Sequence, residues 1–189
     1  MTPTRLSAEE RLDKLDRVFS VDDFQRQQSL SPKAASVYLA RWQALGHIAR
    51  LGPRCGLWVN FLKPGGPSIA WADRAQGVLR KHPQAIVGGE SALRIARWMP
   101  AKDGTDVEII IPQGQSRANF DQTVLILRSP KTHATLWALA RLNAELGLQV
   151  LPPDVAVADL AAQGEDIPRE LRQKAGDVSD LIRRLGGNS

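Results

Sequence analysis

Apolar positions near the start of the chain recur at the three- or four-residue spacing of amphipathic helices. Three helices are predicted there, each beginning at a serine that can accept a hydrogen bond from the first turn. These serines are Ser7, Ser20 and Ser31; the first opens a capping box and the third precedes a proline. The third helix is predicted to run to Leu45, before Gly46. Its predicted apolar face consists of Ala35, Tyr38, Leu39, Trp42 and Leu45.

The segment after the third helix has the pattern of a β-hairpin. Residues 47–51 and 57–60 are predicted strands, and a turn rich in Gly and Pro, with a basic tip, joins them. Three helices followed by a hairpin is the element order of a winged helix-turn-helix. In that motif the third helix enters the major groove of DNA, and the hairpin contacts the DNA backbone or the minor groove. We therefore expect a winged helix-turn-helix domain over residues 1–62.

Residues 63–67, Lys-Pro-Gly-Gly-Pro, have the composition of a linker. Beyond them helical and strand patterns are mixed, which predicts a small mixed α/β domain over residues 68–189. The chain as a whole is thus expected to be α+β. The predicted helices of the second domain span 68–81, 92–98, 133–146, 155–162 and 168–185, and its predicted strands span 85–87, 106–111 and 122–128.

The composition is that of a folded globular chain, with 43% hydrophobic residues in a length of 189. No run of about 18 apolar residues occurs, and the first ten residues are polar, so neither a membrane span nor a signal peptide is expected. A single cysteine, Cys55, leaves no internal disulfide. These features predict a cytoplasmic protein with no membrane partner.

The net charge of +5 is unevenly distributed along the chain. Residues 1–63 contain ten basic and six acidic residues, a net charge of +4, whereas the remainder contains 15 basic and 14 acidic residues, a net charge of +1. No Asp or Glu occurs between Phe24 and Ala72. An acid-free segment of this length predicts a surface that faces phosphate groups. The alternative is a chance pattern in a basic chain.

Six residues of this acid-free segment are candidates for contact with DNA. Basic side chains can pair with phosphates or with guanine, a hydroxyl can donate to either, and a small apolar side chain can meet a thymine methyl group. The alternative interpretation is the solvated side of an ordinary amphipathic helix. The candidates are Lys33, Ser36, Val37 and Arg41 on the third helix, and Arg50 and Arg54 in the hairpin.

Patterns that would indicate catalysis are weak. Ser91 follows Gly-Gly-Glu at a predicted strand-to-helix turn, but the G-x-S-x-G spacing of a nucleophile elbow is missing, so Ser91 or Glu90 is predicted to cap a helix. Cys55 lies in the basic turn and is either a redox-sensing thiol or an incidental cysteine. The three histidines are too dispersed for metal-ligand spacing. We expect no catalytic residue, no metal and no cofactor.

Three segments together resemble the AbiEi-type antitoxins of type IV abortive-infection toxin–antitoxin systems. They are the first-domain stretch from Val18 to Val59, the Ser91-Ala92-Leu93 helix start, and the strand Ile109-Ile110-Ile111-Pro112. The resemblance covers about residues 8–128. Residues 129–189 match no motif of that family, so their role stays open.

The resemblance implies that the first domain binds inverted repeats in its own promoter, on double-stranded DNA, and represses the operon. It also implies that the second domain counters a cognate nucleotidyltransferase-like toxin, directly or indirectly. Two copies on such repeats would form a dimer on DNA. The alternative is a stand-alone winged-helix transcriptional regulator whose second domain binds a ligand or a partner.

Overall fold

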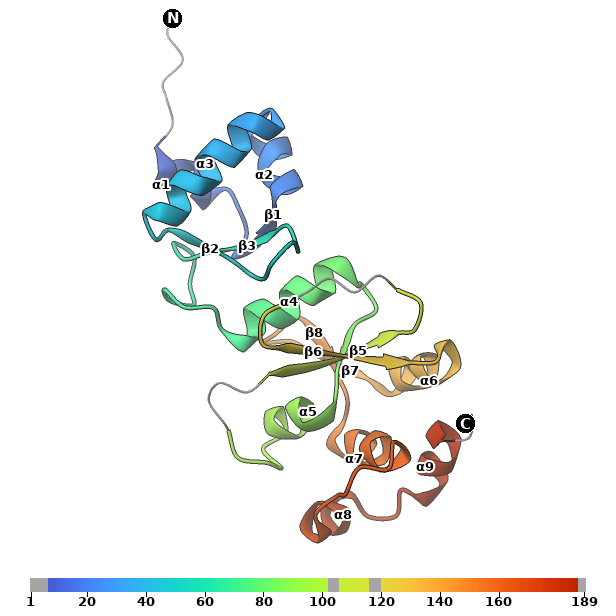
Figure 1. The fold of residues 1–189 in the computed structure, drawn as a ribbon. Helices are drawn as coiled ribbons and strands as arrows, with labels where there is room; N and C mark the ends of the chain where they lie inside the picture. The colour runs from blue at the N-terminus through green and yellow to red at the C-terminus, as the bar shows by residue number, and fades with distance from the viewer. Residues whose placement is uncertain (1–6, 102–105, 116–119, 187–189) are drawn as a thin grey trace, which may run out of the picture. The chain divides into compact units, whose positions relative to one another are not determined.

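The computed structural model describes residues 7–101, 106–115 and 120–186. They form two compact units: residues 7–77 with 120 and 121, and residues 78–101, 106–115 and 122–186 (Figure 1). Each unit has helices and a sheet of its own, so the fold class is α+β, as predicted. Helix α4 (Trp71–Lys81) contains the boundary between the units. Within these ranges no helix is long and apolar enough to cross a membrane.

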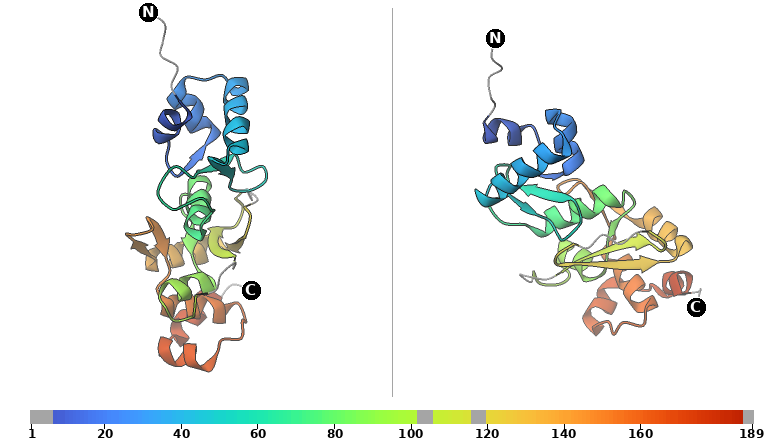
Figure 2. Two further views of the ribbon diagram at one scale, coloured as in Figure 1. Left: turned by 90° about the vertical axis from the view of Figure 1, so that its left-hand side faces the viewer. Right: turned by 45° about the horizontal axis from the view of Figure 1, so that its top comes forward.

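Residues 7–70 of the first unit form three helices and a small antiparallel sheet. Its elements are α1 (Ala8–Asp13), β1 (Val18–Ser20), α2 (Val21–Gln28), α3 (Pro32–Ala44), β2 (Ile48–Arg50) and β3 (Leu57–Asn60). The sheet order is β1-β3-β2, and Trp58 in the central strand pairs with Phe19 on one side and Arg50 on the other. Helix α3, of 13 residues, lies beside α1 and α2 (Figure 2).

The three predicted helix starts are confirmed, because local hydrogen bonds determine them. Ser7 and Ser20 each accept from the backbone N–H three residues later, at 3.1 and 3.0 Å, and both caps are capping boxes. Ser31 caps α3 in the same way, at 3.3 Å. At the other end of α3, Gly46 adopts a φ of +72°, a left-handed conformation that favours glycine.

The predicted apolar face of α3 is correct except at its last position. Ala35, Leu39 and Trp42 are buried in a core that all three helices and the sheet share. Tyr38 is partly buried against that core. Leu45, by contrast, is 56% exposed, because it is the C-cap residue and no longer follows the helical face.

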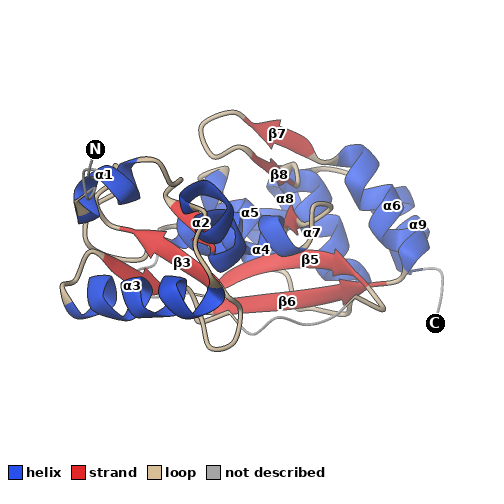
Figure 3. Ribbon diagram, turned by 90° about the horizontal axis from the view of Figure 1, so that it is seen from above, coloured by secondary structure: helices blue, strands red, loops and turns tan. Residues whose placement is uncertain are grey.

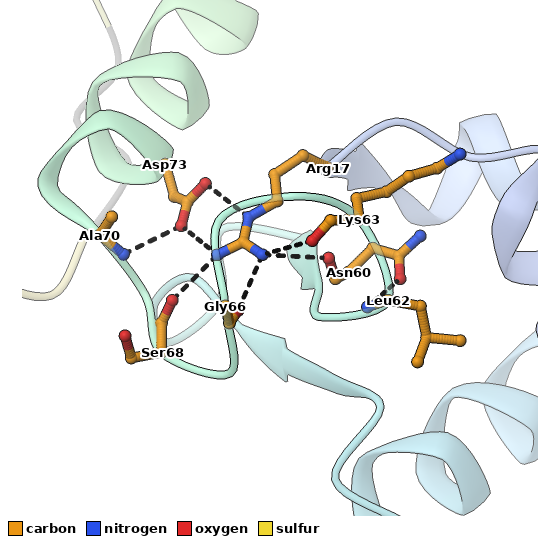
Figure 4. A network of polar contacts seen from close by, with 8 residues as sticks. All are labelled: Arg17, Asn60, Leu62, Lys63, Gly66, Ser68, Ala70 and Asp73. Atoms are coloured by element: carbon orange, nitrogen blue, oxygen red, sulfur yellow. Dashed lines mark hydrogen bonds and ion pairs between the residues drawn. The ribbon is translucent and has the colours of Figure 1, made fainter.

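The predicted linker, residues 63–67, is bound to the first unit by Arg17 (Figure 4). The Arg17 guanidinium forms two hydrogen bonds with the carboxylate of Asp73, at 3.0 and 2.9 Å. It also donates to four backbone carbonyl groups on the way to α4. Their oxygens belong to Asn60 (3.4 Å), Lys63 (3.1 Å), Gly66 (2.9 Å) and Ser68 (2.9 Å). The first unit therefore continues past the linker and ends only at Gly77.

The second unit is built around a mixed five-stranded sheet in the order β6-β5-β4-β8-β7. Its strands are β4 (Ile86–Val87), β5 (Val107–Pro112), β6 (Thr123–Arg128), β7 (Arg141–Asn143) and β8 (Leu148–Val150). Its helices, besides the end of α4, are α5 (Gly89–Ile95), α6 (Pro130–Leu139), α7 (Pro153–Ala162), α8 (Arg169–Ala175) and α9 (Ser179–Gly186). The parallel pair β5 and β6 lies side by side, and each strand has six residues (Figure 3).

Two predicted helices of this unit are wrong in extent. The helix predicted over 133–146 ends at Leu139, because Ala140 turns to extended backbone and the next residues form the β7–β8 hairpin. The helix predicted over 168–185 is divided into α8 and α9, because Gly176 has a φ of +70° between them. Helix α4 also begins three residues later than predicted, at Trp71 rather than after a Ser68 cap.

The predicted cap of α5 is also wrong. The helix begins at Gly89, and its N-cap, Gly88, makes no side-chain cap bond. The carboxylate of Glu108, from β5, instead accepts the backbone N–H of Ser91 at 3.2 Å, while the Ser91 hydroxyl accepts the N–H of Glu108 at 3.0 Å. Burial raises the pKa of Glu108 from its usual value, against the lowering effect of the backbone N–H groups of Ser91 and Glu90. Gly89 leaves the space for this carboxylate, since a Cβ there would lie 2.2 Å from it.

A buried ion pair connects the sheet of the second unit to its C-terminal helices. Arg128, at the end of β6, donates to both carboxylate oxygens of Asp159 in α7, at 3.0 and 2.9 Å. The two side chains are 10% and 1% exposed. Helix α7 packs in turn on α5, α8 and α9. The bidentate contact therefore joins strand β6 to the helix on which α8 and α9 pack.

Candidate nucleic-acid interface

The candidate residues of α3 all lie on its exposed side. Lys33, Val37 and Arg41 follow one another at four-residue intervals, and all three are exposed, Val37 to 63%. Ser36 is exposed in the neighbouring row, and its hydroxyl donates to the carbonyl oxygen of Pro32 at 3.0 Å. That bond uses the hydroxyl hydrogen, so Ser36 can offer an outside partner only its acceptor lone pairs.

The hairpin places two exposed arginines beside the short sheet. Arg50, the last residue of β2, has its guanidinium carbon 5.1 Å from the centre of the Trp58 ring. This stacking orients the side chain and leaves the donors at its edge open. Arg54 lies in the turn with a φ of +61°, a left-handed conformation that is uncommon for a residue with a side chain. The turn therefore directs an arginine outward at a conformational cost.

The six basic residues between Phe24 and Ala72, the segment without acids, fall into two groups. Arg26 binds Asp23 at 2.7 Å, and Lys63 binds Asp13 at 2.9 Å, so these cations are used within the fold. The second group has no carboxylate partner among the residues that the structure describes. It comprises Lys33 and Arg41 of α3, with Arg50 and Arg54 of the hairpin, and we refer to these four residues as the unpaired cations.

Two features of this surface were missed in the sequence. Gln43 is exposed on α3, seven residues after Ser36, and a side-chain amide is a suitable partner for adenine. Its helical spacing from Ser36 was the signal that could have identified it. The second feature is a hollow of about 230 Å³ at the base of the hairpin. No sequence pattern predicts it, because Val21 of α2 helps to line it together with Arg50, Arg54 and Trp58.

Cys55 is buried beneath the hairpin turn. The residue is 3% exposed, and its thiol donates to the carbonyl oxygen of Gly52 at 3.2 Å. A redox-sensing cysteine needs access to an oxidant, so this burial favours the interpretation of Cys55 as an incidental cysteine. The site consequently offers positive charge, one hydroxyl and small apolar side chains.

Comparisons with known proteins give a fold but no family. No model of a known protein family matches the chain. The chain is 31% identical over 123 residues to the phosphatidyl-myo-inositol mannosyltransferase of Mycolicibacterium smegmatis, which covers 59% of this chain and 31% of that enzyme. It thus spans less than a third of the length of this relative.

A solved structure is similar over nearly the whole chain. The crystal structure of the RV2827C protein from Mycobacterium tuberculosis superimposes with a TM-score of 0.70. The match covers 97% of this chain and 73% of that one, at 13% sequence identity. At so low an identity the similarity is one of fold alone.

Proposed function

We propose that the chain is a DNA-binding transcriptional regulator whose first unit is a winged helix-turn-helix. The element order supports this: α1, β1, α2 and α3 precede the β2–β3 hairpin, and the three strands form one antiparallel sheet. In this proposal α3 is the recognition helix and the hairpin is the wing. The buried face of α3 contacts the core, so its opposite face is available to a groove.

The observation that carries the proposal is the set of four unpaired cations in a region without acids. Lys33 and Arg41 are eight residues apart on the exposed side of α3, a distance of about 12 Å along the helix axis. In this proposal they contact two separate points of the DNA, one near each end of the helix. Val37 and Ser36 lie between them and face the base edges, while Arg50 and Arg54 neutralise the flanking phosphates.

The regulated DNA and the second partner follow from the resemblance to AbiEi-type antitoxins. In this proposal the chain binds inverted repeats in its own promoter, represses its operon, and counters a nucleotidyltransferase-like toxin encoded beside it. The stand-alone regulator stays the alternative. The mannosyltransferase similarity adds no step to the proposal, because the aligned segment represents a minor part of that enzyme.

DNA binding is tested by fluorescence anisotropy with a labelled duplex of the chain's own upstream sequence, over a series of salt concentrations. If each of the four unpaired cations contacts a phosphate, log K falls against log salt with a slope of about −3.6, and Arg54→Ala reduces the slope by about 0.9. The matched control is Arg26→Ala, which removes an exposed arginine that is already paired with Asp23. Absence of binding at low salt, or an equal loss in the control, overturns the proposal.

The antitoxin role is tested separately by co-expression with the adjacent gene. The full-length chain should restore growth to cells that express that gene, and Lys33→Ala/Arg41→Ala should still do so while losing promoter repression. Growth rescue without DNA binding would refute the regulator and keep the antitoxin. DNA binding without rescue would leave the stand-alone regulator.

A further inference from the structure

The hollow of about 230 Å³ at the base of the hairpin combines basic and apolar side chains. Arg50 and Arg54 line it and are exposed. Leu57 and Trp58 of β3 line it from below and are only 2% and 4% exposed. In the part of the chain that the structure describes, no carboxylate belongs to this lining. The hollow therefore offers positive charge beside apolar surface.

Backbone hydrogen bonds hold the walls of the hollow in place. Leu51 donates to the carbonyl oxygen of Leu57 at 3.0 Å, which closes the hairpin. Val21, at the start of α2, donates to the carbonyl oxygen of Gly56 at 3.3 Å, which fastens the turn to that helix. Val21 and Gly56 are themselves part of the lining. A site whose walls are already ordered loses less conformational entropy when a ligand binds.

Two guanidinium groups that line one hollow attract an anion. Both belong to the unpaired cations, so no carboxylate of the described residues neutralises them. A guanidinium presents its N–H donors as a planar fork that fits the oxygens of a carboxylate or a phosphate. The guanidinium carbon of Arg50 lies 5.1 Å from the centre of the Trp58 ring. The ring therefore orients Arg50 through one face and leaves its edge donors to the anion.

We propose that the hollow binds a small organic anion. Its carboxylate or phosphate group pairs with Arg50 and Arg54, and its apolar part packs on Val21, Leu57 and Trp58. Pockets for drug-sized ligands have volumes of roughly 300–1,000 Å³. A volume of about 230 Å³ lies below that range and suits a single ring or a short chain.

A phosphate of the DNA backbone shares the chemistry that the two arginines recognise. The free organic anion is the better occupant because the hollow also has apolar walls, which a highly charged backbone does not use. A ligand in the hollow would withdraw Arg50 and Arg54 from DNA and act as an inducer. That consequence rests on the proposed function, whereas binding of the anion itself does not.

Binding is tested without DNA, by isothermal titration calorimetry of the full-length chain with four probes. Benzoate and phenyl phosphate carry both an anionic group and a ring. Benzamide lacks the charge, and inorganic phosphate lacks the ring. At least one of the first two should bind at least tenfold more tightly than either of the last two. No binding of benzoate or phenyl phosphate, or equal binding of benzamide or inorganic phosphate, would overturn the proposal.

The arginines are tested with the probe that binds more tightly. Arg50→Gln and Arg54→Gln should each weaken its binding at least fivefold, because each removes one charged partner of the anion. The matched control is Arg26→Gln, which removes an exposed arginine that is paired with Asp23 and should leave the affinity unchanged. An equal loss in the control would mean that the anion binds the basic surface in general, not the hollow.

The hollow itself is tested by filling it. Val21→Trp adds a large side chain to the lining without changing the charge, and should weaken binding of the same probe at least tenfold. Val124→Trp, at a residue that is 43% exposed in the second unit, is the matched control. Circular dichroism verifies that each variant is folded. Unchanged affinity in a folded Val21→Trp variant would show that the anion does not occupy the hollow.

The two sources of the anion are separated by fluorescence anisotropy with the promoter duplex, at matched ionic strength. Saturating probe should weaken duplex binding and reduce the salt slope by about 1.8, since two of the four unpaired cations are withdrawn. A chain that binds the duplex but neither anionic probe would keep the proposed regulator and refute the anion site. A chain that binds a probe but no duplex would keep the anion site and refute the regulator.

Discussion

Arginine has opposite uses in the two units. In the second unit Arg128 is 10% exposed and holds Asp159 with two hydrogen bonds, so its charge is consumed inside the fold. In the first unit Arg41 and Arg54 are exposed, and no carboxylate pairs with them in the described residues. Charge that the fold does not use is available to an outside partner. The comparison thus separates arginines that stabilise the molecule from arginines whose charge is available to an outside partner.

The largest effect is expected from breaking the buried pair of the second unit. Arg128→Met leaves the carboxylate of Asp159 buried without a partner, and should lower the free energy of unfolding by about 3–5 kcal/mol in urea denaturation. The double variant Arg128→Met/Asp159→Leu removes both charges and should recover most of that loss. A double variant as unstable as the single one would mean that the side-chain shapes, not the charges, matter.

Arg17 tests whether the difference lies between units or between buried and exposed arginines. It belongs to the first unit, yet its side chain is 17% exposed and its partner Asp73 is 8% exposed. Arg17→Met should cost about 2–3 kcal/mol of stability, since it removes hydrogen bonds to a charged group and to several carbonyls. Surface substitutions usually change stability by less than about 0.5 kcal/mol. A loss below that value would mean that Arg17 contributes no more to stability than an exposed cation does.

The unpaired cations should show the reverse result. Lys33→Ala and Arg41→Ala should each change the free energy of unfolding by no more than about 0.5 kcal/mol. Each should weaken DNA binding by about 1–3 kcal/mol with relaxed sequence preference if it contacts a base, or uniformly over all sequences if it contacts a phosphate. Large losses of stability would contradict the separation of roles.

The smallest effect concerns pH and the second unit alone. Burial lowers the pKa of His133, although its Nε2 donates to the carbonyl oxygen of Gln84 at 2.9 Å. His133 therefore binds a proton less readily in the folded state than in the unfolded state, where its pKa is about 6.5. The stability that the buried, neutral His133 contributes is present above that pH and is lost as the pH falls below it. His133→Gln should give a flatter stability profile between about pH 7 and 5.

The features that the sequence predicted correctly are those that neighbouring residues determine. The starts of α1, α2 and α3 follow from serines that bond to residues three positions away. The β7–β8 hairpin was missed because the apolar residues of the hairpin have helical spacing. Strand β8 is held in the sheet by β4, about sixty residues earlier in the chain. The cap of α5 was missed for the same reason, since Glu108 comes from another strand.

The candidate site shows a similar limit. The exposure of Lys33, Val37 and Arg41 could be predicted, because helical spacing separates them from the buried face. Which cations stay unpaired could not be predicted. Lys63 belongs to the same acid-free segment as Arg41, but it binds Asp13, fifty residues away along the chain. Only the folded chain distinguishes a cation that is used from one that is available.

The Arg17 contacts determine where the molecule can be divided for separate expression. A fragment that ended at residue 62 would lack Asp73 and most of the carbonyl groups to which Arg17 donates. It would also remove Gly77, which lies so close to Leu51 that a Cβ there would be 1.9 Å from that side chain. A first-unit fragment should therefore extend through α4, and a protease should spare the Gly65-Gly66 pair in spite of its linker-like composition.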